Sequence, residues 1–251
     1  MKPIIVFDFD GVICDSTDEC LVTSWNAWEC WHGRAGYRPS IDNFSKSDRD
    51  AFRPLRPYVR GAGEYYVLRR CLEENLPISG QSDFENYCRK WMQYLSSFNK
   101  VFYKERERMR AENLQGWLDL HPVWPEVVNL FKRLYREGRT YVATLKDGES
   151  VRLILEVHEL PLPAERLLDQ SQIASKLEAL EMIKEIEGCS AQDLIFLDDN
   201  ATHLIEPLRA GYSCYLTTWG NAPAEYRKIA EVHGIPLAKL HDLDSILKTK
   251  G

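Results

Sequence analysis

Short apolar runs alternate along this chain with longer segments in which apolar residues recur every three or four positions. The first pattern is typical of buried strands, and the second is typical of helices with one buried face. Strands are predicted at five runs, namely Ile4–Phe7, Thr140–Thr144, Arg166–Asp169, Leu194–Leu197 and Ser213–Thr217. Because strands and helices alternate, the predicted fold is α/β, with a parallel sheet covered by helices on both faces.

The helices of this alternating pattern begin and end at recognisable residues. Pro125 suits the first position of a helix that stops at Gly138. Ser175 and Glu178 have the spacing of a capping box, which opens a helix that runs to about Glu187. Further helices are expected at Val151–Glu159, from about residue 200 to Gly211, and at Ala224–His233 and Leu243–Lys248.

Residues 16–121 differ in composition from the rest of the chain and are rich in Trp, Tyr and Arg. Helical patterns occur there at Leu21–Trp31, Glu64–Asn75, Asp83–Phe98 and Lys104–Leu114. The polar, proline-containing stretch Tyr37–Gly63 predicts a long loop. We therefore interpret residues 16–121 as a mostly α-helical domain, inserted into a catalytic core of residues 1–15 and 122–251.

Composition and charge narrow the class of protein. The 251 residues carry a formal net charge of −6 with both signs interspersed, and 44% of them are hydrophobic. This balance is ordinary for a globular protein and provides no basic surface for nucleic acid. No apolar stretch approaches the length of a membrane span. We therefore expect neither a nucleic-acid partner nor a membrane partner, and the sequence indicates no oligomeric state.

The cysteines and the N-terminal residues indicate the cellular compartment in which the protein is expected. The seven cysteines are odd in number and include no C-x-x-C pair, which argues against a disulfide framework or a structural zinc site. Free thiols favour a reducing compartment. The apolar run at Ile4–Phe7 is too short for a signal peptide. We expect a cytoplasmic protein.

Two carboxylates follow the first predicted strand, at Asp8 and Asp10, and Gly11 then allows a sharp turn. Two acidic groups this close together at the end of a buried strand need compensation, and a divalent cation supplies it. The alternative, about equally favoured by these residues alone, is a surface turn without chemistry.

Three further positions fall at the corresponding ends of predicted elements. Asp198 and Asp199 form a second acidic pair after an apolar strand, although such a pair also serves as a helix N-cap. Thr144 ends a strand, where a threonine is usually structural. Lys176 lies in the first turn of a helix, where it opposes the helix dipole unless an anion or acidic neighbour is present. Otherwise it is a solvated surface lysine.

Taken in order, these residues resemble the four sequence motifs of the haloacid dehalogenase-like superfamily. The motifs are Asp8-Phe9-Asp10-Gly11-Val12, then Thr144, then Lys176, then Asp198-Asp199. The resemblance covers residues 1–15 and 122–220. The insertion between the first two motifs is similar to the helical cap that this superfamily carries there. A Rossmann-like sheet is implied for the core.

The resemblance implies a Mg²⁺-dependent phosphohydrolase that cleaves a small phosphorylated metabolite, a phosphate monoester. Asp8 would be the nucleophile and would carry an aspartyl-phosphate, and Asp10 would be the general acid and base. Thr144 and Lys176 would bind the phosphoryl group. The metal would be held by four aspartates, Asp8, Asp10, Asp198 and Asp199.

Two departures from the superfamily pattern leave questions open. His203 stands where a later acid is usual, so the division of metal binding between Asp198 and Asp199 is undecided. Thr144 is followed by Leu145-Lys146, where Asn-Lys is more usual, and the Lys146 side chain points either into the site or to solvent. Two alternatives to a phosphatase remain, a sugar-phosphate mutase of the same superfamily and a non-catalytic binding protein that retains the fold.

Residues of the insertion offer candidates for substrate contact. An arginine of the stretch that contains Arg53, Arg56 and Arg60 could bind a carboxylate or a second phosphate, although each is more simply a solvated surface residue. The tryptophans are expected to pack in the core of the insertion rather than to stack on a substrate.

Overall fold

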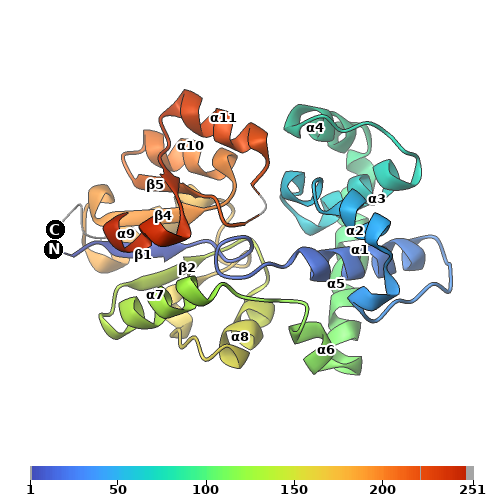
Figure 1. Ribbon diagram of the computed structural model, residues 1–251, viewed down its shortest axis with the longest axis horizontal. Coiled ribbons are helices and arrows are strands. Elements are labelled where there is room, and N and C mark those ends of the chain that lie inside the picture. The colour runs from blue at the N-terminus through green and yellow to red at the C-terminus, as the bar shows by residue number, and fades with distance from the viewer. Residues whose placement is uncertain (1, 221, 247–251) are drawn as a thin grey trace. The chain divides into compact units, whose positions relative to one another are not determined.

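The computed structural model describes residues 2–220 and 222–246. The chain forms two compact units (Figure 1). Unit 1 comprises Met1–Asp15 and Pro122–Gly251, and unit 2 comprises Ser16–His121. Among the helices of the described residues, none is both long and apolar enough to cross a membrane.

Unit 1 is built on a six-stranded sheet in the order β3-β2-β1-β4-β5-β6, in which every neighbouring pair is parallel. The strands are β1 (Ile4–Phe7), β2 (Thr140–Ala143), β3 (Leu167–Leu168), β4 (Leu194–Asp198), β5 (Ser213–Thr217) and β6 (Leu237–Ala238). The first five lie where the apolar runs predict them. The sequence analysis missed β6, a two-residue edge strand whose Leu237 is exposed. The predicted α/β fold class is confirmed.

Helices cover both faces of this sheet. They are α7 (Pro125–Arg136), α8 (Gly148–Val157), α9 (Lys176–Glu187), α10 (Ala201–Arg209), α11 (Ala224–His233) and α12 (Leu243–Ile246). Ile4 and Val6 of β1 pack in one core with buried residues of α9, α10 and α11. Phe7 points to the opposite face and contacts Phe131 of α7, with ring centroids 5.6 Å apart. Of the helix predicted at Leu243–Lys248, residues 247 and 248 lie outside the described residues.

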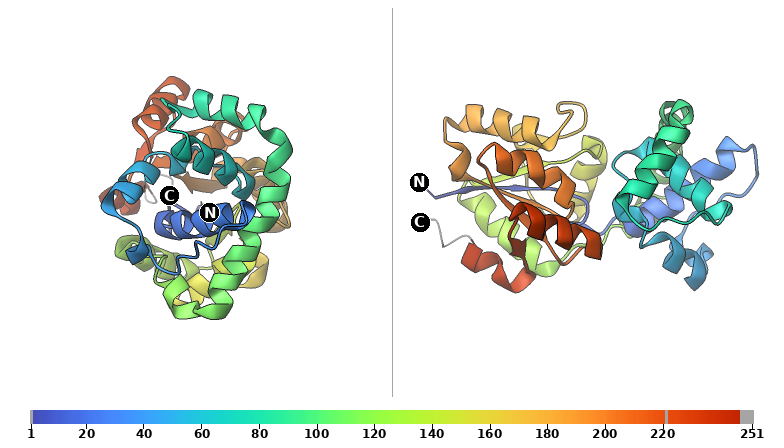
Figure 2. Two further views of the ribbon diagram at one scale, coloured as in Figure 1. Left: turned by 90° about the vertical axis from the view of Figure 1, so that its right-hand side faces the viewer. Right: turned by 90° about the horizontal axis from the view of Figure 1, so that it is seen from above.

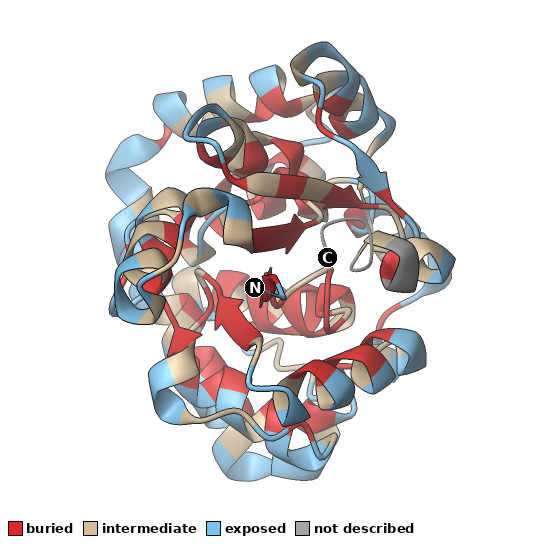
Figure 3. Ribbon diagram, turned by 90° about the vertical axis from the view of Figure 1, so that its left-hand side faces the viewer, coloured by how far each residue is buried: buried red, intermediate tan, exposed pale blue. Residues whose placement is uncertain are grey.

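The burial pattern explains why the central strands read as continuous apolar runs. All residues of β1, β2 and β4 are buried, as expected for strands enclosed on both faces. Figure 3 shows these strands in red inside the helices, whose outer surfaces are pale blue.

The first turn of α9 differs in one detail from the predicted capping box. The Ser175 hydroxyl accepts the backbone N–H of Glu178 at 3.1 Å, as predicted. The Glu178 carboxylate, however, accepts the N–H of Ala174 at 2.6 Å, one residue before the cap. The N–H of Glu178 in the first turn is still satisfied by the cap residue, and the helix begins where the pattern places it.

Unit 2 is helical throughout. Its helices are α1 (Thr17–Trp31), α2 (Lys46–Phe52), α3 (Tyr65–Glu73), α4 (Gln81–Lys90), α5 (Met92–Glu112) and α6 (Leu114–Leu118). Figure 2 shows α1, in blue, beside the long helix α5, in green. The loop predicted at Tyr37–Gly63 is wrong in part, because it contains α2 and three short 3₁₀ turns. Ser45 and Asp48 form the capping box that starts α2.

The boundary between the last two helical patterns of unit 2 is also wrong. A break was expected between Phe98 and Lys104, whereas α5 runs through that stretch and the chain breaks at Trp91 instead. The buried positions Phe98, Phe102 and Met109 follow one face of α5, so a single amphipathic helix crosses the expected gap.

Aromatic side chains form much of the core of unit 2. Trp28 lies 5.4 Å from Tyr66 and 6.3 Å from Phe98, measured between ring centroids. Trp31 also contacts Phe98 at 5.9 Å, and Trp91 contacts Tyr66 at 6.4 Å. These tryptophans pack within their own unit, as the sequence analysis favoured.

The arginines singled out in the insertion make contacts inside unit 2. Arg53 pairs with Asp18 at 3.3 Å, and Arg60 pairs with Glu85 at 2.7 Å. Arg56 lies 3.5 Å from the Ser16 hydroxyl. The first two pairs are partly exposed, so each contributes little to stability.

Candidate active site

Neighbouring strands of unit 1 bring four side chains to one edge of the sheet. β1 lies between β2 and β4 and runs parallel to both, so their carboxyl ends meet. Asp8 follows β1, Thr144 follows β2, and Asp198 ends β4. Lys176 is the first residue of α9, with Ser175 as its N-cap. All four of these side chains are buried.

Asp8 and Lys176 form a buried ion pair. The Lys176 ammonium donates to Asp8 Oδ1 at 2.6 Å and to the carbonyl oxygen of Ala143 at 2.7 Å. The backbone N–H of Phe9 donates to the same Asp8 oxygen, also at 2.6 Å. Two donors therefore hold Oδ1, which orients the second carboxylate oxygen, Oδ2, in a fixed direction.

A second carboxylate shares this ammonium. Asp198 Oδ2 lies 3.7 Å from Lys176 Nζ. Burial, and then the charge of Asp198, raise the pKa of Asp8 from 3.8 to about 6, although Lys176 opposes the shift. Burial alone would lower the pKa of Lys176, but Asp8 and Asp198 together raise it. The lysine is therefore cationic at neutral pH.

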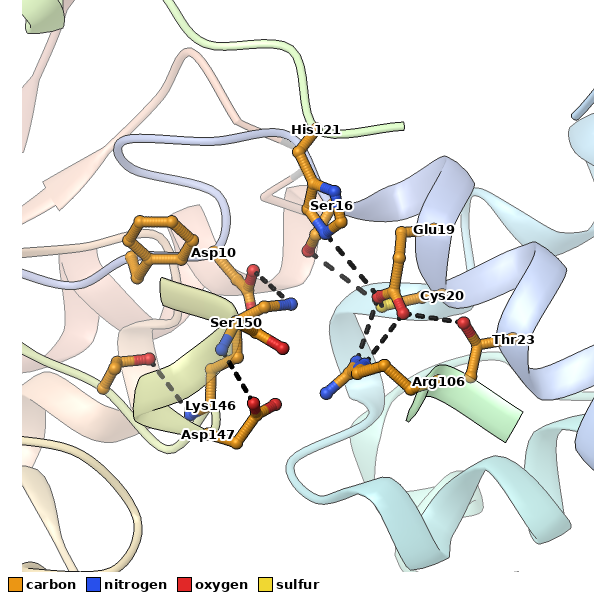
Figure 4. Close-up of polar contacts among 12 residues, drawn as sticks. Asp10, Ser16, Glu19, Cys20, Thr23, Arg106, His121, Lys146, Asp147 and Ser150 are labelled. Atoms are coloured by element: carbon orange, nitrogen blue, oxygen red, sulfur yellow. Dashed lines mark hydrogen bonds and ion pairs between the residues drawn. The ribbon is translucent and has the colours of Figure 1, made fainter. Parts of the chain in front are cut away.

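Asp10 has a lysine partner of its own. The Lys146 side chain points into the site, which answers the question that the sequence left open. It is 4% exposed, and its ammonium lies 3.4 Å from Asp10 Oδ1 (Figure 4). The Lys146 backbone N–H donates to Thr144 Oγ1 at 3.1 Å. Because that hydroxyl accepts one bond through a lone pair, its own hydrogen remains a donor for a ligand.

Gly11 shapes the turn that follows Asp10. Its φ is +82°, which favours glycine, and a Cβ there would lie 2.0 Å from Asp199 Oδ2. Gly220 approaches the same turn, since a Cβ on it would lie 2.4 Å from the Gly11 carbonyl oxygen. Asp199 therefore packs against the Gly11 turn, whereas Asp198 lies beside Lys176.

We expect Gly11→Ala to destabilise the protein by about 2–4 kcal/mol, because it combines an unfavourable φ with a collision against Asp199. Urea denaturation would measure the change. The matched control is Gly188→Ala, at a φ of +59° with open space around its Cβ position, for which only about 1 kcal/mol is expected. Equal losses in the two variants would contradict the close contact between Gly11 and Asp199.

Comparisons with known proteins give matches among solved structures only. No protein-family model and no curated protein matches the sequence. A protein from Lactobacillus delbrueckii subsp. bulgaricus, named by inference as a phosphoglycolate phosphatase, aligns with a TM-score of 0.66 and 17% identity over 98% of each chain. A predicted phosphoglycolate phosphatase from Haemophilus somnus aligns at 0.62 and 18% over 97% of each chain.

A third structure carries the family name. It is a protein from Bacteroides fragilis, named by inference as a haloacid dehalogenase-like hydrolase, and it aligns at a TM-score of 0.60 and 14% identity. The match covers 95% of this chain and 96% of that one. The chain has the haloacid dehalogenase-like fold. The alignment with this fold extends over nearly all of both units.

Within the haloacid dehalogenase-like fold of this chain, the donor atoms around Asp8 fit a divalent cation. One atom each from Asp8, Asp198 and His203 lie within 4.8 Å of one another. Carboxylate oxygens of this kind suit Mg²⁺. The four aspartates of the site outnumber its two lysines, Lys146 and Lys176, by two charges, which one divalent cation would balance.

The six residues predicted from the sequence are thus joined in different ways. Asp8 and Asp198 both pair with Lys176, Asp10 and Thr144 are linked through Lys146, and Asp199 packs on the turn at Gly11. The structure adds two residues to this set, Lys146 and His203. Both had a sequence signal, since Lys146 stands two positions after Thr144 and His203 stands one helical turn after Asp199.

Proposed function

We propose that this protein is a Mg²⁺-dependent phosphohydrolase that cleaves a small phosphate monoester through an aspartyl-phosphate on Asp8. The observation that carries the proposal is the buried Asp8 carboxylate, held through Oδ1 by Lys176 and by the Phe9 N–H. A carboxylate oriented in this way presents Oδ2 for attack. Two of the similar structures are named by inference as phosphoglycolate phosphatases and one as a haloacid dehalogenase-like hydrolase, and these names support the same class.

In the first step, Asp8 Oδ2 attacks phosphorus and the bond from phosphorus to the ester oxygen breaks. Asp10, entering as the neutral acid, gives its proton to the departing oxygen, and its carboxylate then pairs with Lys146. In the second step, Asp10 takes a proton from water, which attacks the aspartyl-phosphate. Inorganic phosphate leaves, and both Asp8 and protonated Asp10 are regenerated.

The phosphoryl group needs donors that are already in place before it arrives. Thr144 retains a hydroxyl hydrogen, because its oxygen accepts the N–H of Lys146. Lys176 donates two of its three N–H groups to Asp8 and Ala143. Asp198 lies beyond hydrogen-bond distance of the ammonium, at 3.7 Å, so the third N–H can turn toward a phosphoryl oxygen. These donors neutralise charge on the transferring group as it moves.

Magnesium would be held by the Asp8 carboxylate and the Asp10 carbonyl oxygen, with Asp198 and Asp199, and it would offset the repulsion between an anionic nucleophile and an anionic substrate. The buried position of Asp8 and the raised pKa of its carboxyl fit this assignment, because a cation relieves the cost of that buried charge.

We propose unit 2 as the cap of the enzyme. Its two connections to the core pass through Asp15 and Pro122, and the first of these follows β1 at the edge of the sheet that carries Asp8. We assign recognition of the leaving group to this unit, because a domain inserted at this point can select the substrate without supplying the reacting groups. The substrate is then a small phosphorylated metabolite, with phosphoglycolate as the first ester to test.

The test is phosphate release from a panel of small esters, with Mg²⁺ and with a chelator. Phosphoglycolate, sugar phosphates and nucleotides should be included. We expect hydrolysis that requires the metal, with a loss of at least about 10³-fold when the metal is removed. Turnover that is unaffected by the chelator would contradict the metal assignment. Activity that depends on a sugar bisphosphate would favour the mutase, and no turnover of any ester would favour a binding protein.

A further inference from the structure

We infer, on the basis of the proposed metal site, that His203 is a nitrogen ligand of the bound cation, and that the site, while able to hold Mg²⁺, therefore binds Mn²⁺, Fe²⁺ or Co²⁺ with higher affinity. His203 Nδ1 lies 3.2 Å from Asp198 Oδ2, and an oxygen of Asp8 completes the cluster within 4.8 Å. The ligand set predicted from the sequence contained aspartates only.

The separation of the two donor atoms is that of adjacent ligands on one ion. Two atoms that each bind a metal at about 2.1 Å, at right angles to each other, lie about 3.0 Å apart. The observed 3.2 Å between His203 and Asp198 needs almost no adjustment. Both atoms can therefore bind one cation without movement of the backbone.

Local structure fixes both partners. Asp198 Oδ1 accepts the backbone N–H of Asn200 at 2.8 Å, which leaves Oδ2 directed toward His203. Asn200 is the N-cap of α10, and its side chain accepts the N–H of Thr202 at 3.0 Å. His203 lies in the first turn of α10, and its side chain is 20% exposed, so the ring is accessible to a cation from solvent.

A nitrogen ligand changes which metals are favoured. Mg²⁺ prefers oxygen ligands and water. Imidazole binds first-row transition metals more strongly than it binds Mg²⁺, and its affinity rises in the order Mn²⁺, Fe²⁺, Co²⁺, Ni²⁺. The competing role for His203 is to donate Nδ1–H to Asp198 and so orient that carboxylate from outside the coordination sphere. The two roles differ in one observable, a bond from nitrogen to the metal.

Pulsed electron paramagnetic resonance of bound Mn²⁺ tests for that bond. The metal-stripped full chain is loaded with Mn²⁺, once with natural histidine and once with histidine labelled with ¹⁵N. We expect a ¹⁴N coupling that changes to a ¹⁵N coupling in the labelled protein and is lost in His203→Asn. The matched control is His233→Asn, on α11, which should keep the coupling.

Calorimetric titration gives an independent measurement of the preference. We expect His203→Asp to lower the ratio of Mn²⁺ to Mg²⁺ affinity at least about 10-fold, because it restores an all-oxygen site. Circular dichroism confirms that each variant is folded. An unchanged ratio in this variant would argue for the outer, orienting role.

Failure of this inference is distinct from failure of the proposed function. Bound Mn²⁺ without a histidine coupling would overturn the nitrogen ligand even in a protein that hydrolyses esters. A clear coupling in a protein without hydrolysis would support the ligand and count against the phosphatase.

Discussion

Asp8→Asn is expected to reduce ester hydrolysis by at least about 10⁴-fold, because an amide cannot form the aspartyl-phosphate. The substitution is nearly isosteric and keeps an oxygen for Lys176 and the Phe9 N–H. Steady-state phosphate release is the measurement. Asp50→Asn is the matched control, since that carboxylate belongs to an exposed ion pair with Lys46 and should leave turnover unchanged. Full activity in Asp8→Asn would contradict the proposed mechanism.

The same substitution should raise stability in the absence of metal. The pKa of Asp8 is raised from 3.8 to about 6, so the folded protein holds this proton more tightly than the unfolded chain does. Asp8 therefore stabilises the fold at low pH, and that contribution is lost as the pH rises from about 4 through 6. The loss amounts to roughly 3 kcal/mol at most, at 1.36 kcal/mol per pKa unit.

An uncharged asparagine does not titrate, so the variant should gain on the wild type as the pH rises. Thermal melting in chelator at pH 4.5 and at pH 7.5 would show the gain. A variant that loses stability relative to the wild type over this interval would contradict the raised pKa. An active-site carboxyl that costs stability while it enables chemistry is a common trade-off.

Arg106→Met is expected to destabilise the protein by about 3–5 kcal/mol, because it leaves a buried carboxylate without its counter-charge. Glu19 is fully buried and accepts two hydrogen bonds from Arg106, at 2.8 and 3.0 Å (Figure 4). Thr23 donates a further bond to Glu19 at 2.6 Å. Urea denaturation followed by tryptophan fluorescence is suitable, since five of the seven tryptophans lie in unit 2.

Two further variants isolate the buried charge. Lys46→Met, on α2 of the same unit, removes an exposed pair with Asp50 and should cost no more than about 0.5 kcal/mol. Adding Glu19→Gln to Arg106→Met should recover at least about 1 kcal/mol, because no charge is then left buried alone. Similar losses for Arg106→Met and Lys46→Met would contradict a stabilising role for the buried pair of Glu19 and Arg106.

Most of the sheet could be predicted because each of its longer strands is a run of apolar residues that is visible in the local sequence. Ile4–Phe7 and Leu194–Leu197 are apolar throughout, which suits strands buried on both faces, and acidic residues mark where each strand ends. β6 could not be found in this way. It has two residues, and its existence depends on pairing with β5, which is a tertiary event.

The helices of unit 2 and two site residues show the limits of local pattern. The boundary at Trp91 depends on how α4 and α5 pack, which a hydrophobic period does not specify to within a few residues. The direction of Lys146 is set by the turn after β2 and by Asp10, whose carboxylate is distant in sequence. The proximity of His203 to Asp198 likewise required the start of α10 to be known.

The way the chain leaves and rejoins unit 1 has a consequence for engineering. Asp15 donates its backbone N–H to the carbonyl oxygen of Pro122 at 2.8 Å, and Cys14 forms an antiparallel bridge with Val123. The two chain segments that flank the insertion are therefore held side by side within unit 1. A foreign segment whose own termini lie close together could be grafted there without a change in the core, because the two chain ends are already hydrogen-bonded to each other. The 106 residues of Ser16–His121 could therefore be exchanged for another recognition domain, while the residues around Asp8 stay unchanged.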